Sequence, residues 1–155
     1  MLTFYLVIKL VLSVLLILTV KMLWKKIKKI EAVVYYLTIA SIMQISNNIV
    51  ALNLELITFK EAGIVIPILQ LDRLIILPII TLWLIYFYRS TTRLLSFYLT
   101  IIWASLFIAT TYANNFAGVL SIEKWNAFIG FTEMFVIYVL FIGFNNFFKV
   151  IEERV

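Results

Sequence analysis

Residues 63–88 read GIVIPILQLDRLIILPIITLWLIYFY, and Asp72 and Arg73 are the two charged residues among them. A helix that crosses a bilayer needs roughly 20 predominantly apolar residues. The stretch therefore predicts a membrane-spanning helix that carries an acidic and a basic side chain next to each other.

Two prolines in this stretch leave its course open to two interpretations. Pro67 and Pro78 remove backbone donors and interrupt the helical hydrogen-bond ladder. Either a kinked helix crosses the membrane, or residues 64–71 lie in the interface and a short span begins near Leu74. We favour the kinked helix.

Four further apolar stretches flank this one, and short polar connections join them. The connections read KKIKKIE, ELITFKEA, RSTTR and GVLSIEKWN. The sequence thus predicts an all-α fold with a single transmembrane domain, residues 1–155. The five expected spans are residues 2–23, 32–54, 63–88, 94–116 and 127–148.

The composition supports a membrane location. The chain has 155 residues, of which 65% are hydrophobic and 14% charged, whereas soluble domains contain about half apolar and about a quarter charged residues. The net charge of +5 comes from basic residues scattered between apolar blocks. A nucleic-acid partner, which requires one exposed basic patch, is therefore not expected.

The basic residues predict the orientation of the chain. Nine lie on one side of the five spans, where the positive-inside rule places the cytoplasm. Lys60 and Lys124 lie on the other side. We therefore expect the N-terminus outside and the C-terminus inside, in a bacterial cytoplasmic membrane. The nine are Lys21, Lys25, Lys26, Lys28, Lys29, Arg89, Arg93, Lys149 and Arg154.

The residues that the chain lacks narrow its chemistry. It has no Cys and no His, which excludes thiol nucleophiles and metal sites built on thiolate or imidazole. Its four glycines form no phosphate-binding loop. We expect no enzymatic activity, no cofactor and no bound metal.

Charged and polar residues within the spans are the candidate ligand-binding residues. Charges are costly inside a bilayer, so each needs a partner or water. Four of them are charged, namely Lys9, Asp72, Arg73 and Glu133. Each of the four lies about six to nine residues from the outer end of its helix, which places Asp72 roughly 13 Å deep. Ser41, Gln44 and Asn48 share one helix face, and Thr111 and Asn115 are one turn apart. The candidates are Lys9, Asp72, Arg73, Glu133, Gln44, Asn48 and Asn115.

Two interpretations of these residues remain open. They could form a polar pocket that opens to the outside and binds a polar ligand or an ion. They could instead join the helices through hydrogen bonds, as Asn, Gln and Ser often do in membranes. The leading expectation is a non-enzymatic binding or accessory protein. The alternative is a small ion- or proton-coupled carrier or channel that acts as an oligomer, and association with a larger membrane complex is also plausible.

A few positions resemble a known family. They are Asp72 and Pro78 in the third span, Trp103 in the fourth, and the Lys124–Trp125 pair before the last. Over residues 71–149 the chain resembles the small multi-pass membrane proteins of unknown function of Bacillus-like and Clostridium-like spore formers. Members often carry a Glu in the fourth span and aromatic-His residues after it, where this chain reads TTYANNFAGVLS. The resemblance implies a location and a topology, not an activity.

Overall fold

The structure is a computed structural model that describes residues 1–60, 63–88 and 92–152. Within these ranges, the side chains of 93, 141, 142 and 144–152 are not described. Four of the basic residues that predict the orientation are therefore wholly or partly outside the described residues. Two are outside entirely, Arg89 and Arg154, and two lack a described side chain, Arg93 and Lys149.

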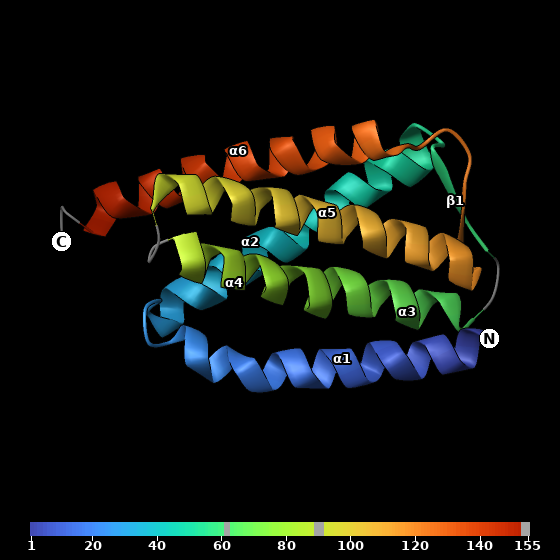
Figure 1. Cartoon of the computed structure of the whole chain (residues 1–155), viewed down its shortest axis with the longest axis horizontal. Helices are drawn as coiled ribbons and strands as arrows, with labels where there is room; N and C mark the ends of the chain where they lie inside the picture. Colours follow the sequence, from blue (N-terminus) through green and yellow to red (C-terminus); the bar gives the residue numbers. More distant parts are fainter. Residues whose placement is uncertain (61–62, 89–91, 153–155) are drawn as a thin grey trace.

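The fold is all-helical, and successive helices run in opposite directions along the long axis of the molecule (Figure 1). Two short strands lie at one end of the bundle, which we call the strand end. The elements are α1 (Leu2–Leu23), α2 (Lys29–Asn48), η1 (Ile49–Asn53), β1 (Ile57–Phe59), α3 (Val65–Leu71), η2 (Asp72–Ile76), α4 (Leu77–Tyr88), α5 (Arg93–Ala117), β2 (Leu120–Ile122) and α6 (Ala127–Glu152). The segments η1 and η2 are π-helical turns.

Among the described residues, four helical segments are long and apolar enough to cross a membrane: Leu2–Leu23, Lys29–Asn53, Val65–Tyr88 and Leu94–Ala117. The described apolar part of α6, Ala127–Leu140, is shorter. Large apolar side chains such as Phe4, Phe116 and Phe128 are exposed on the outer surface. Such a surface is unusual for a soluble monomer and suits a lipid environment.

The segment Val65–Tyr88 occupies the centre of the bundle. In its most apolar window 67% of the residues are buried, against 17–28% for the other three segments. Helix α4 packs against α1, α2 and α5, and α6 packs on the far side of α5. Asp72 and Arg73 therefore lie in the most enclosed part of the fold.

Residues 65–88 form one continuous helix, so the structure has no break between 64–71 and Leu74. Pro67 lies in the first turn of α3, where a missing N–H interrupts no bond, so our expectation that it disturbs the ladder was wrong. The disturbance is at Pro78. The Leu77 N–H bonds to the Asp72 carbonyl across a π turn, and the Tyr36 hydroxyl donates to the Leu74 carbonyl, four residues before Pro78.

The loops at the strand end pair with each other, which the sequence reading missed. Strands β1 and β2 are antiparallel, with Ile57 opposite Ile122 and Phe59 opposite Leu120. Helix α5 ends at Gly118, whose φ of +79° is a left-handed conformation that favours glycine. The pair covers the strand end over Val50, Ile108 and Trp125.

Candidate functional site

Asp72 is the centre of a closed hydrogen-bond network that joins three helices. Its Oδ1 lies 2.6 Å from Lys9 Nζ in α1, and its Oδ2 accepts from Asn114 Nδ2 in α5 at 2.9 Å. Asn114 Oδ1 in turn accepts from the Tyr5 hydroxyl at 2.8 Å. Lys9 also lies over the Tyr5 ring, 5.1 Å from its centroid. We call Tyr5, Lys9, Asp72 and Asn114 the Asp72 network.

Arg73 is the next residue along η2, but it points in another direction, because neighbouring helical residues diverge by about 100°. Its guanidinium lies over the Phe59 ring, with Cζ 5.2 Å from the centroid. The side chain is buried, with 7% of the residue exposed. Within the described part of the chain, Nε and Nη2 have no hydrogen-bond partner. The cation–π contact therefore compensates only part of the burial of this charge.

Glu133, in α6, is held by two side chains from other elements. Its Oε1 accepts from the Ser46 hydroxyl in α2, and its carboxylate accepts a second hydrogen bond from the Trp125 side chain. In the described ranges, no ion pair joins Glu133 to Arg73. The carboxylate thus has neutral donors as its direct partners.

The position of Trp125 depends on the strand end. The backbone N–H groups of Glu123, Lys124 and Trp125 all point to the Leu56 carbonyl, at 3.0–3.2 Å. Gly130 lets the indole lie against α6, because a Cβ there would stand 2.6 Å from Trp125 Cζ2. The pairing of the two loops therefore brings Trp125 to Glu133.

Asp72, Arg73 and Glu133 line one small cavity of about 40 Å³ near the strand end. We call it the Arg73 cavity. It lies between α2, η2, α5, the strands and the start of α6. A buried water needs roughly 10–15 Å³, so the volume suits up to about three waters or one small ligand. Other polar side chains on its wall are Asn47, Thr110, Thr111, Asn114 and Trp125.

The hydrogen-bonding capacity left over in this cavity is that of a donor. Both oxygens of Asp72 are engaged, and Glu133 accepts two hydrogen bonds. Among the described residues on the wall, the buried side-chain atoms without a partner all belong to Arg73. The described residues also contain no group of three or more His, Cys, Asp or Glu side chains suited to a metal ion. The cavity is therefore better matched to an acceptor than to a cation.

The structure brings together four of the seven candidate residues. Asp72, Arg73 and Glu133 line the cavity, and Lys9 reaches it through Asp72. The other three lie apart, so their placement in the pocket was wrong. Asn48 and Asn115 are exposed, and Gln44 is half-buried outside the cavity with a buried Oε1 that has no partner among the described residues.

The errors arise because neighbouring residues on a helix point to different faces. The buried face of α2 and η1 follows Ile39, Met43 and Val50, which places Asn47 inward and Asn48 outward. The buried face of α5 includes Asn114, whereas Asn115 Oδ1 accepts from the Ile122 N–H, 3.2 Å away.

Several contributing residues were not among the candidates: Tyr5, Ser46, Asn47, Asn114 and Trp125. The spacing of buried apolar residues could have found Ser46, Asn47 and Asn114. For Tyr5 and Trp125 the sequence contains no such signal, because their contacts depend on loop pairing and on the placement of α1 against α5.

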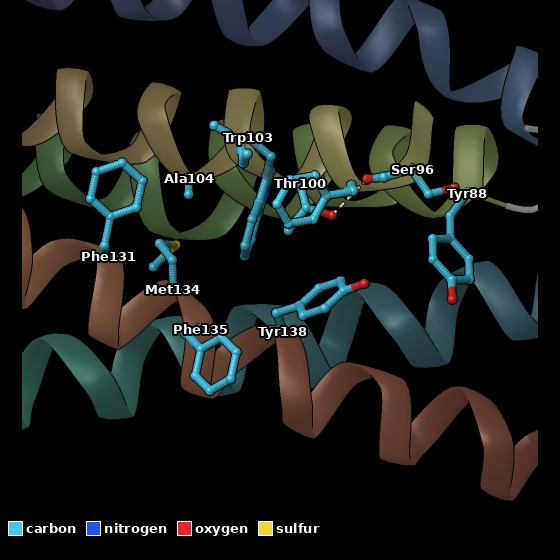
Figure 2. Close-up of a pocket in the computed structure, with 11 residues that line it drawn as sticks. Tyr88, Ser96, Thr100, Trp103, Ala104, Phe131, Met134, Phe135 and Tyr138 are labelled. Carbon is cyan, nitrogen blue, oxygen red and sulfur yellow. Dashed lines mark hydrogen bonds between the residues drawn. The ribbon is translucent and has the colours of Figure 1, made fainter. Parts of the chain in front are cut away.

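A second hollow, of about 630 Å³, lies between α5 and α6 away from the strand end (Figure 2). Aromatic residues dominate it, with Trp103 and Tyr138 facing each other and Phe131 and Phe135 further along α6. Two hydroxyls on its wall donate to their own helix, Ser96 to the Thr92 carbonyl and Thr100 to the Ser96 carbonyl. This groove offers mainly apolar surface, as a site for lipid chains would.

Comparison of the chain with protein-family models, with curated proteins and with solved structures gives no match. The resemblance to spore-former membrane proteins therefore stays a prediction.

Proposed function

We propose that this chain is a five-span bacterial membrane protein, with α6 as the fifth span and the strand end outside. The four apolar helices, the exposed apolar surface and the distribution of Lys and Arg in the sequence support this topology. The Arg73 cavity then lies in the outer half of the bilayer.

The function that we propose is non-enzymatic binding of a small polar ligand or ion in the Arg73 cavity. The observation that supports it is the buried Arg73 guanidinium on the cavity wall, two of whose nitrogens lack a partner among the described residues. A side chain that served only to join helices would direct these donors at an acceptor. An intramembrane charge with unused donors is a candidate ligand site by default.

A second candidate is a small carrier in which Asp72 and Glu133 couple ligand movement to protons or ions. Two carboxylates on one cavity and the π turn at Asp72–Ile76 favour it, since π turns are frequent at functional sites. In proteoliposomes, a carrier predicts that Asp72→Asn or Glu133→Gln abolishes flux while the protein still folds. Intact flux in both folded variants would exclude coupling through these carboxylates.

Single-cysteine labelling tests the topology, because the chain has no native Cys. We expect Lys124→Cys in intact cells to react with a membrane-impermeant maleimide, and Lys25→Cys to react only after the cells are opened. The reverse pattern would overturn the orientation.

The same chemistry tests the cavity. Thr111 lines the cavity, whereas Thr132 is exposed on α6 next to Glu133 and serves as the control. The two side chains are matched, because each hydroxyl donates a hydrogen bond to a carbonyl of its own helix. We expect Thr111→Cys to react with silver ion, a thiol reagent small enough for the cavity, and Thr132→Cys, facing lipid, to stay unmodified. If neither cysteine reacts, the cavity is sealed from solutes and the proposed function fails.

A further inference from the structure

Arg73 presents its unused donors in a particular arrangement. Nε and Nη2, which have no hydrogen-bond partner in the described part of the chain, lie along the same edge of the planar guanidinium. The N–H bonds on this edge are nearly parallel and form the fork with which arginine binds anions in a bidentate manner. The guanidinium Cζ lies 5.2 Å from the centroid of the Phe59 ring, which offers no oxygen or nitrogen acceptor to this edge, and both nitrogens are buried.

The neighbouring acidic groups do not fill the fork. Asp72 is the nearest in sequence, but the Lys9 ammonium and the Asn114 amide occupy its two oxygens. Glu133 lies on the cavity wall, where Ser46 and Trp125 hold it. Lys9 offsets the formal charge of Asp72, so Arg73 shares the attraction of that carboxylate with an ammonium group and is compensated only in part.

We propose that the Arg73 cavity binds a compact monovalent anion, of the size of chloride or nitrate, at the Nε–Nη2 edge of Arg73. The inference rests on the proposed binding function and names its ligand class. A volume of about 40 Å³, enough for up to about three waters at roughly 10–15 Å³ each, holds one such ion but not a phosphate ester or an amino acid. Arg73 brings one positive charge to the cavity, and one negative charge balances it, so a monovalent anion suits the site better than a divalent one.

Thermal unfolding of the purified full chain in nanodiscs tests this assignment. Chloride, nitrate and gluconate are compared at constant ionic strength. A ligand that binds only the folded state multiplies the folding constant by 1 + [L]/Kd, about ten-fold per decade of concentration above Kd. We expect this response to chloride and nitrate, and none to gluconate, which is too large for the cavity.

Variants of Arg73 connect the response to the fork. Arg73→Gln should abolish it, whereas Lys60→Gln, which removes the same charge from an exposed side chain at the strand end, should keep it. Arg73→Lys retains the charge but lacks the fork, and should weaken the apparent affinity about ten-fold. If Arg73→Gln fails to fold, Arg73→Lys and the anion series on the native chain still provide the test.

Three outcomes would overturn the proposal: no response of the native chain to chloride or nitrate, an equal response to gluconate, or an unchanged response in Arg73→Gln or Arg73→Lys. The Thr111→Cys experiment separates this failure from failure of the proposed function. If Thr111→Cys is reactive in a chain that does not respond to anions, the cavity admits solutes but not an anion, and water fills the fork of Arg73.

Discussion

Asp72 and Arg73 are adjacent in the sequence and both buried, yet their surroundings differ. Each oxygen of Asp72 has a hydrogen-bond donor within 2.9 Å, and the network it centres on joins α1, η2 and α5. Arg73 faces an aromatic ring and a cavity, with two nitrogens left over. A closed network stabilises one arrangement of helices, whereas unused donors at a cavity are available for a ligand. Burial alone does not distinguish these two roles, but hydrogen-bond partners do.

The largest loss of stability is expected when the Asp72 network is broken. Asp72→Ala leaves the Lys9 ammonium buried without its counter-charge, and removing one partner of a buried ion pair costs about 3–5 kcal/mol. We expect a loss of this size in the free energy of unfolding, measured by denaturant titration in detergent. The double variant Lys9→Met/Asp72→Leu should return to within about 1 kcal/mol of the native chain. No recovery in the double variant would show that Asp72 acts through something other than this pair.

A smaller effect is expected from disturbing the wall of the cavity at Gly130. In Gly130→Ala the new methyl group would lie 2.6 Å from Trp125 and 2.9 Å from Ile108, so the indole must shift. Overpacking of this kind costs about 1–3 kcal/mol. Gly143→Ala is the matched control, since nothing lies within 4 Å of a Cβ there. Equal stability of the two variants would contradict the described packing of Trp125 on α6.

Tyr36 donates a hydrogen bond to a backbone carbonyl within the π turn that contains Asp72 and Arg73. Its hydroxyl donates to the Leu74 carbonyl, whose usual partner would be the N–H that Pro78 lacks. We expect Tyr36→Phe to lower the free energy of unfolding by about 1 kcal/mol. Tyr138→Phe, at the α5–α6 groove, is the control and should leave stability unchanged. A larger loss in the control than in Tyr36→Phe would place the important hydroxyl elsewhere.

The smallest effect on stability is expected at Arg73, where a ligand-binding role and a structural role predict different results. Arg73→Met removes a buried charge that lacks hydrogen-bond partners, so in gluconate the unfolding free energy should change by less than about 1 kcal/mol. The loss should appear in chloride, where the native chain alone is stabilised. A penalty in gluconate as large as that of Asp72→Ala would mean that Arg73 belongs to the structural network.

Much of this arrangement could be predicted from the sequence, because apolar length and charge placement are local properties. The apolar stretches, and the depth of Lys9, Asp72, Arg73 and Glu133 within them, come directly from the order of residues. The choice between Asn47 and Asn48, or between Asn114 and Asn115, depends on a rotation of about 100° per residue and on which helix packs against which. Those are tertiary properties.

Other features had no local signal. The pairing of Lys9 with Asp72 joins residues 63 positions apart. The β1–β2 pair forms between two loops that the sequence presents as polar connections. Through that pair Trp125 reaches Glu133, so the wall of the cavity depends on contacts that no single segment contains.

The most direct test of the contrast between the two neighbours is a crystal structure of the chain grown with bromide in place of chloride, with the anomalous signal used to locate bromide. We expect one bromide within hydrogen-bonding distance of Arg73 Nε and Nη2, and none within that distance of Asp72. An Arg73 guanidinium bonded directly to Glu133, with no bromide beside it, would contradict the account.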